Sequence, residues 1–305
     1  MALYKSSPQQ MPRVLESHCR IPTGANMSGP CTPRNLLMHI AKSYNRTHPE
    51  HKIDVRMPKA QLYDAINRLL ADECGTDYNE ACWLHSTNEH ITPEIRRRIE
   101  SYVSPTAPMS WRSVPDTWLS NVDIDQVMNP ITNHRALRFQ YMGTFPIDFQ
   151  ERDSMGSCVG KGMCDFVARD LRPKKKKDRW GMILNLDTHE MSGSHWVAMY
   201  CDMDPASKKY GIYYFDSNGK PPPSHVQRFV RQVKHEINDK RFRFSWSKVP
   251  IQRSNTECGM FCIVYLMCML YSTMGAAAIV KNRDIMNDAN MLRYRNTIFH
   301  VPTKF

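Results

Sequence analysis

The stretch Gln252-Arg-Ser-Asn-Thr-Glu-Cys258-Gly, followed by the apolar run GMFCIVYLMCML at 259–270, decides how this chain folds. An apolar run of this length exceeds a typical strand and predicts a buried helix that begins at Cys258. A thiol at a helix N-terminus lies at the positive end of the helix dipole, among backbone N–H groups without partners in the helix, and both favour the thiolate. The pattern therefore indicates a cysteine nucleophile at the start of a core helix.

Two segments upstream carry the other groups that such a nucleophile needs. Residues 195–203 and 209–216 are rich in β-branched and aromatic residues, and the turn-forming sequence Asp204-Pro-Ala-Ser207 separates them. This arrangement predicts a β-hairpin. If the turn centres on its Pro-Ala pair, His195 lies directly opposite Asp216, where a carboxylate can orient an imidazole.

Gln252 lies six residues before Cys258, where its side-chain amide can donate to an oxyanion beside the Cys258 N–H. In this interpretation Cys258 attacks a carbonyl, His195 transfers the proton and Asp216 holds the imidazole tautomer. The order His, Asp, Gln, Cys predicts a thiol hydrolase. Taken singly, each residue has an alternative in ordinary packing or turn formation.

The motifs His195-Trp-Val-Ala, Tyr214-Phe-Asp-Ser and Gln252–Gly259 resemble the adenain and Ulp1-like clan of cysteine proteases. They look closest to the polyprotein-processing, SUMO-protease-like proteases of nucleocytoplasmic large DNA viruses such as the asfarviruses. Residues 117–124 are similar to the Trp-Leu-x-Asp helix start of the clan, and the resemblance runs with gaps over roughly residues 115–300. It implies an α+β papain-like fold with a central mixed sheet, the buried Cys258 helix and a helical N-terminal domain.

The resemblance also implies a function. Members of the clan in large DNA viruses cleave core or structural polyproteins at Gly-Gly-Xaa sites during virion maturation, in the virion and the viral factory of the host cytoplasm, with the host nucleus as a further location. Trp118 and Trp196 fall where the clan forms a narrow tunnel over the scissile Gly-Gly, which excludes residues that carry a Cβ. Core packing is the alternative for either indole.

Three other functions remain open. A deubiquitinase or deSUMOylase-like isopeptidase of the same clan uses the same residues, and so do the clan's Ser/Thr acetyltransferases, which act on an acyl donor. A non-catalytic DNA-binding core protein is the alternative outside enzymes. Hydrolysis of a Gly-Gly-Xaa peptide, compared with that of a ubiquitin-like fusion, distinguishes the enzyme interpretations. Failure of a thiol-reactive Gly-Gly aldehyde to label Cys258 would support the DNA-binding core protein.

The length of 305 residues suffices for one catalytic domain and an appendage. We interpret the polar, Pro-rich residues 1–33 as a mobile leader and residues 34–104, with apolar positions every third or fourth residue, as a helical N-terminal domain. Residues 105–305 are then the cysteine protease catalytic domain. The Pro-rich segment 104–108 is the expected linker.

The net charge of +11 suggests that the chain contacts a polyanion in addition to its protein substrate. The basic runs Lys174–Lys177 and Arg96–Arg98 can approach phosphate, which predicts weak DNA binding. A solvated loop is the simpler interpretation of the lysine run.

Ten cysteines raise the question of disulfides and metals. A thiol nucleophile favours a reducing compartment, in which disulfides are rare. The pairs Cys74/Cys82 and Cys158/Cys164 lack the spacing of zinc knuckles, so we expect no metal and no cofactor. We also expect no membrane span, because run 259–270 is too short, and no secretory signal in the first 30 residues.

Overall fold

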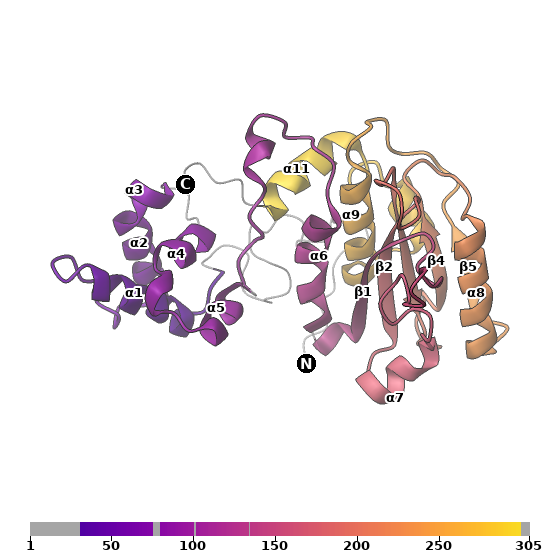
Figure 1. The fold of residues 1–305 in the computed structure, drawn as a ribbon, viewed down its shortest axis with the longest axis horizontal. Coiled ribbons are helices and arrows are strands. Elements are labelled where there is room, and N and C mark those ends of the chain that lie inside the picture. The colour runs from indigo at the N-terminus through magenta and orange to yellow at the C-terminus, as the bar shows by residue number, and fades with distance from the viewer. Residues whose placement is uncertain (1–30, 76–79, 101, 134, 300–305) are drawn as a thin grey trace. The chain divides into compact units, whose positions relative to one another are not determined.

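The computed structural model describes residues 31–75, 80–100, 102–133 and 135–299 (Figure 1). These residues form two compact units, one of residues 116–294 and another of residues 31–115 with 295–299. Residues 1–30 of the expected leader lie outside the described residues.

A five-stranded mixed sheet forms the centre of the 116–294 unit (Figure 1). Its strands lie side by side in chain order: β1 (Phe139–Pro146), β2 (Arg179–Asn185), β3 (Trp196–Asp202), β4 (Gly211–Phe215) and β5 (Arg243–Trp246). β1 pairs with β2, and β4 with β5, in parallel, whereas β3 is antiparallel to both of its neighbours. The expected α+β class with a central mixed sheet is confirmed.

Helix α8 (Ser224–Ile237) covers one face of the sheet and α9 (Cys258–Tyr271) covers the other (Figure 1). α8 is amphipathic and its apolar side joins the main core. α9 is buried over all of residues 258–270, as expected for a helix that is apolar around its whole circumference. Gly181 on β2 lets α9 approach closely, since a Cβ there would lie 3.2 Å from Leu266 Cδ2.

Three further helices of this unit are α6 (Asn121–Met128), α7 (Leu171–Lys175) and α10 (Ala276–Lys281), and residues 288–294 of α11 (Asp288–Ile298) also belong to it. α6 begins at a capping box, in which Asp123 N donates to Ser120 Oγ (3.2 Å) and Ser120 N donates to Asp123 Oδ2 (2.8 Å). The helix start that the sequence motif predicts after Trp118-Leu119 is therefore confirmed.

The β3–β4 hairpin forms as predicted, but its register differs by two residues. The expected tetrapeptide turn is followed by a second turn over residues 207–210. The added turn moves the pairing so that Phe215 lies opposite Ala198. The prediction that His195 lies directly opposite Asp216 is therefore wrong, although a shift of two residues keeps both side chains on the same face.

The other unit is helical. Its helices are α1 (Arg34–Thr47), α2 (Lys59–Leu69), α3 (Ala71–Cys74), α4 (Glu80–Ser86) and α5 (Pro93–Glu100). The helical character predicted for this region is confirmed, and Leu70 separates α2 from α3. Their shared core includes Leu37, Ile40, Leu62, Ile66, Trp83 and Ile99.

The division between the units falls after Pro115, later than the expected boundary after residue 104. The contacts of Trp111 explain this position. Its ring lies edge-on to the Phe299 ring, with 5.1 Å between the ring centres, and the Arg295 guanidinium lies 4.5 Å from the centre of the Trp111 ring. The segment after residue 104 and the end of the described chain therefore belong with the helical unit.

Two disulfides join described cysteines to each other, one in each unit. Cys74 bonds Cys82 and Cys158 bonds Cys164, with Cα–Cα distances of 5.6 and 5.9 Å. The expectation of reduced thiols is wrong for these four residues. The short loops that separate the partners bring their Cα atoms within bonding range, and this proximity depends on the local backbone path.

Within the described residues, no helix combines the length and apolar character that crossing a bilayer requires. The same residues contain no group of three or more His, Cys, Asp or Glu side chains arranged to hold a metal ion.

Candidate active site

His195 and Asp216 meet at the end of the β3–β4 hairpin. Asp216 Oδ1 lies 2.7 Å from His195 Nε2 and accepts the backbone N–H of Asn218 at 2.8 Å. The carboxylate is wholly buried and the His195 side chain is 15% exposed. Although the two residues are not direct strand partners, the diagonal across the hairpin still joins them.

The other side of the imidazole faces Cys258. Burial of His195 acts to lower its pKa, but hydrogen bonds to Asp216 and to Cys258, together with the charges of both, outweigh burial and raise the pKa to about 9. An imidazole held between a carboxylate and a thiol can take the thiol proton and return it to a departing group. The structure thus brings together three of the residues that the sequence selected.

Cys258 is the first residue of α9 and is only 2% exposed. Its neighbour Gly259 allows close packing, because a Cβ there would lie 3.1 Å from Leu119 and 3.3 Å from Trp196 Cδ1. At the far end of the helix, the Lys209 ammonium donates to the last carbonyl groups and complements the helix dipole. Helix α9 is therefore held at both ends.

Gln252 lies next to the segment that carries Asp216, and both ends of its amide are engaged. Its Oε1 accepts the Ser217 hydroxyl at 2.6 Å, and its Nε2 donates to the Ser254 carbonyl at 2.7 Å. The backbone N–H of the residue after Gln252 donates to Asp288, which also accepts Ser254 N at 3.0 Å. The bond to Ser254 uses one of the two Nε2 hydrogens of the amide.

The two tryptophans differ in exposure. Trp196 is 8% exposed and its indole N–H donates to the Leu119 carbonyl at 2.9 Å, whereas Trp118, the residue before Leu119, is 45% exposed. The bond from Trp196 holds the Trp118-Leu119 segment against the first turn of α9. Trp118 is therefore the indole that solvent and a bound molecule can reach.

The loop before His195 is tied at its base by Asn185. The Asn185 Oδ1 accepts Asp187 N at 3.0 Å and Ser194 N at 3.1 Å, and the Ser194 hydroxyl donates to Asp187 Oδ1 at 2.6 Å. Gly193 has a φ of +96°, and a Cβ there would lie 2.7 Å from the Asn185 amide. Only glycine fits this position.

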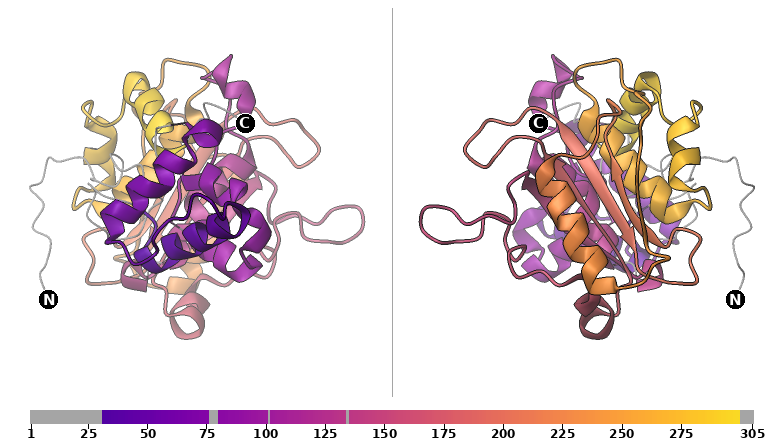
Figure 2. Two further views of the ribbon diagram at one scale, coloured as in Figure 1. Left: turned by 90° about the vertical axis from the view of Figure 1, so that its left-hand side faces the viewer. Right: turned by 90° about the vertical axis from the view of Figure 1, so that its right-hand side faces the viewer.

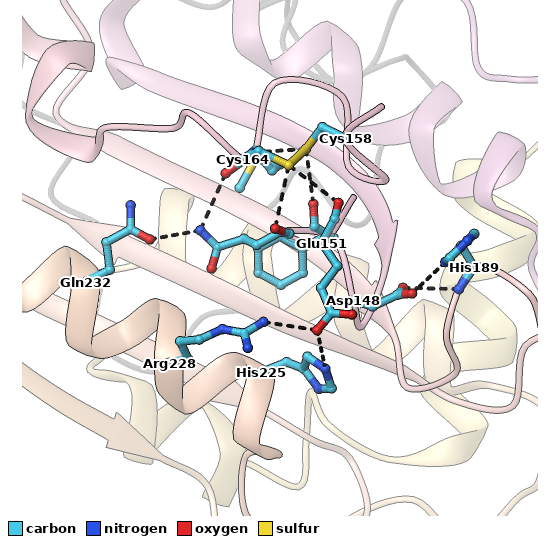
Figure 3. Close-up of polar contacts among 11 residues, drawn as sticks. Asp148, Glu151, Cys158, Cys164, His189, His225, Arg228 and Gln232 are labelled. Carbon is cyan, nitrogen blue, oxygen red and sulfur yellow. Dashed lines mark hydrogen bonds and ion pairs between the residues drawn. A yellow bond between two sulfur atoms is a disulfide. The ribbon is translucent and has the colours of Figure 1, made fainter. Parts of the chain in front are cut away.

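A second contact holds the same loop at its middle (Figure 3). Asp148, which is 3% exposed, accepts His189 N at 3.1 Å and faces His189 Nδ1 at 2.6 Å. The hydrogen bond with Asp148 raises the pKa of His189, although burial opposes this. Sequence reasoning missed this pair, because 41 residues separate its members and neither lies in a catalytic motif.

The segment that carries Asp148 is itself anchored to α8 (Figure 3). Glu151 accepts His225 Nε2 at 3.1 Å and Arg228 Nη2 at 3.3 Å. The disulfide between Cys158 and Cys164 closes the same segment further along. The segment that contacts the loop before His195 is therefore itself held by α8 and by a disulfide.

Two of the four lysines in the run Lys174–Lys177 have partners within the chain. Lys174 pairs with Asp170 at 2.6 Å, and Lys177 donates to the Thr132 carbonyl at 2.5 Å. Lys175 and Lys176 remain exposed. DNA binding through this run stays a prediction, and so does a contact through Arg96–Arg98.

Comparison with known sequences points to proteases of large viruses. A putative thiol protease of Acanthamoeba polyphaga mimivirus is 25% identical over 296 residues, which cover 90% of this chain and 91% of that protein. A cysteine protease of African swine fever virus is 30% identical over 131 residues, 42% of this chain and 46% of that protein. A family model described as YopJ Serine/Threonine acetyltransferase matches residues 161–289.

A solved structure shares the fold. The crystal structure of a protease of African swine fever virus matches with a TM-score of 0.62 and 17% sequence identity, over 93% of this chain and 96% of that one. At this identity the likeness supports the fold alone.

Proposed function

We propose that the chain, a cysteine protease similar to proteases of large DNA viruses, belongs to the adenain and Ulp1-like clan and cleaves core or structural polyproteins at Gly-Gly-Xaa sites. The cleavage serves virion maturation, in the virion and at the viral factory in the host cytoplasm, with the host nucleus as a further location.

The observation that carries the proposal is the placement of the His195 imidazole between Asp216 and Cys258. In the proposed reaction, Cys258 attacks the scissile carbonyl and forms a thioester. His195 accepts the thiol proton and returns one to the leaving amine, and Asp216 holds the imidazole tautomer. Water then hydrolyses the thioester with His195 as base.

We assign the oxyanion contacts to the Cys258 backbone N–H and to Gln252. A helix N-terminus presents N–H groups to an anion, and the other Nε2 hydrogen of Gln252 supplies a second donor. Each such donor is worth about 2.7–4 kcal/mol in measured systems.

Selectivity for glycine is proposed to come from Trp118 and Trp196. Trp196 packs with Leu119 against Gly259, directly beside the nucleophile, and Trp118 is exposed at the same place. A substrate that reaches Cys258 between these groups has little room for a Cβ.

Peptide substrates test this specificity. Replacing the P1 Gly of a cleavable Gly-Gly-Xaa peptide by Val should lower kcat/KM by about a hundredfold or more, and replacing the P1′ residue should cost only a few-fold. Trp118→Ala should reduce the difference between the loss of kcat/KM at P1 and the loss at P1′. Val122 is also exposed and apolar, so Val122→Ala serves as the matched control. Equal losses at P1 and P1′ would exclude an indole tunnel, and mass-spectrometric mapping of cleavage sites in candidate core proteins would identify the substrate.

An acetyltransferase is the second candidate, because the matching family model covers His195, Asp216 and Cys258. A thioester on Cys258 can pass an acetyl group to a hydroxyl as readily as to water, so the residues alone do not separate the reactions. Incubation with labelled acetyl-CoA and core proteins distinguishes them: peptide cleavage without protein acetylation supports the protease. A ubiquitin-like fusion in place of the peptide tests an isopeptidase in the same way.

A further inference from the structure

A groove with an apolar floor and a basic side lies between α8 and β5, away from Cys258. It has a volume of about 450 Å³, and its lining includes Pro221, Pro222, Arg231, Lys234, Phe244 and Trp246. β5 is the last strand of the sheet, and α8 lies in front of the sheet in the right-hand view of Figure 2. The groove therefore opens along the edge strand of the sheet that the structure describes.

The charges of the groove are all of one sign. Arg231 and Lys234 lie one turn apart on α8, both exposed, and neither side chain has an ion-pair or hydrogen-bond partner in the part of the chain that the structure describes. Among the described residues that line the groove, none is acidic. The neighbouring Lys248 adds a third cation, 5.3 Å from the centre of the Trp246 ring. Such a surface complements carboxylates.

The floor of the groove offers apolar contact. Phe244 and Trp246 are half-buried and point to the α8 side of β5, where they pack on the edge of the main core. Trp246 also lines a smaller hollow of about 150 Å³ with Tyr265 and Val280. Aromatic side chains beside an arginine are typical of protein-binding sites.

We propose that this groove binds an acidic peptide segment of a partner protein. An apolar side chain of the segment packs on Phe244 and Trp246 at the floor of the groove, and carboxylates on either side of it contact Arg231 and Lys234. A peptide fits better than a nucleic acid, because the groove supplies few cations and the Lys248 side chain already lies over the Trp246 ring.

The groove is also connected to the active site along the chain. Pro221 follows Asp216 by five residues, and Trp246 precedes Gln252 by six. These two segments are joined where Ile251 N donates to the Ser217 carbonyl at 2.8 Å. A bound segment therefore contacts the two stretches that lead to Asp216 and Gln252, without covering either residue.

A binding measurement tests the proposal independently of any cleavage. The full chain with Cys258→Ala is titrated into a fluorescein-labelled peptide that carries glutamates on both sides of a leucine and a phenylalanine. We expect saturable binding that weakens with salt and that is lost when the glutamates become glutamines or the two apolar residues become serines. The absence of binding to this peptide would overturn the proposal.

Protein variants locate the site. Arg231→Gln with Lys234→Gln should weaken binding by about fivefold or more. Lys208→Gln with Lys240→Gln removes the same charge from exposed positions of the same unit and should leave binding unchanged. Equal weakening by both pairs would show unspecific charge attraction and contradict the groove.

Two further comparisons complete the test. A single-stranded oligonucleotide of equal charge should not displace the peptide, and displacement that depends on Arg231 and Lys234 would assign the groove to nucleic acid instead. In the chain with Cys258 intact, the Arg231→Gln, Lys234→Gln pair should hydrolyse a short Gly-Gly-Xaa peptide at the original rate. Loss of hydrolysis would contradict the separation of groove and active site.

Discussion

At the scale of single residues, Asp216 controls the proton on His195. The hydrogen bond between them helps to raise the imidazole pKa to about 9, so the proton that His195 takes from Cys258 stays on the imidazole through neutral pH and is lost as the pH rises through 9. The step that protonates the leaving amine needs the protonated form. Activity should therefore decline on the alkaline side near pH 9.

Asp216→Asn keeps a hydrogen-bond acceptor but removes the charge. The loss of activity at neutral pH should be mild, and the alkaline decline should move to lower pH because the His195 pKa falls. The dependence of kcat/KM on pH for the two proteins measures this shift. An alkaline limb at the same pH in both would show that Asp216 does not set the proton affinity of His195.

Gln252 can be separated from the nucleophile by comparing two rates. Gln252→Ala should lower kcat for peptide hydrolysis by about 10²–10³-fold and leave alkylation of Cys258 by iodoacetamide unchanged. Cys258→Ala should abolish both reactions, and His195→Ala should reduce both. Ser217→Ala is the matched control, since it removes the hydroxyl that holds the amide and keeps the amide itself.

If Gln252→Ala slowed alkylation as much as hydrolysis, Gln252 would act on the thiol rather than on the oxyanion. A loss as large in Ser217→Ala would show that orientation of the amide, rather than its presence, limits the reaction.

At the scale of elements, close packing at the first turn of α9 depends on a glycine, Gly259. Alanine is usually better than glycine in a helix by about 1 kcal/mol, but at Gly259 its Cβ would lie 3.1 Å from Leu119 and 3.3 Å from Trp196. Gly259→Ala should therefore raise KM for a Gly-Gly peptide by about tenfold as these groups move.

Gly275→Ala provides the comparison, because a Cβ at that position meets nothing within 4 Å. Steady-state kinetics of both variants give the result. An unchanged KM in Gly259→Ala would mean that Leu119 and Trp196 do not shape the substrate path.

The loop from Asp187 to Ser194 is the element that presents His195, and Asp148 holds its middle. Asp148→Asn should weaken the contact with His189 and lower kcat by about tenfold, with a smaller effect on KM, because the imidazole is less well placed. Glu151→Gln in the same segment breaks only contacts with α8 and should leave kcat unchanged. Equal effects of the two changes would indicate a general loss of stability in this segment.

At the scale of the whole molecule, the surroundings of each thiol decide which of them reacts, and only Cys258 has His195 as a partner. The three other free cysteines among the described residues, Cys201, Cys262 and Cys268, are fully buried. Burial raises the pKa of Cys201 and of Cys262, and raises that of Cys268 to about 12. Thiols held neutral and out of solvent react slowly with alkylating agents.

Brief treatment of the native chain with iodoacetamide should therefore modify Cys258 far ahead of these three. Peptide mapping by mass spectrometry gives the pattern, with denatured protein as the control in which all four react. The paired residues Cys158 and Cys164 should be labelled only after reduction. Early modification of Cys262 would show that the N-terminal half of α9 opens in solution.

The sequence by itself determined the features that depend on local pattern. An apolar run without interruption predicted the buried helix that starts at Cys258. Two segments rich in aromatic and β-branched residues, separated by a turn sequence, predicted the hairpin that carries His195 and Asp216. These predictions succeed because burial and backbone preference act over a few neighbouring residues. The helix and the hairpin that carry the candidate residues could therefore be predicted from the sequence alone.

Only the tertiary structure decided the register of the hairpin and the supports around it. A second turn after Ser207 shifted the pairing by two residues, which no count of turn-forming residues revealed. The contact of Asp148 with His189 and the engagement of Gln252 by Ser217 join residues that are 41 and 35 positions apart. Such contacts depend on how distant segments pack, and that packing is a property of the whole chain rather than of any short stretch.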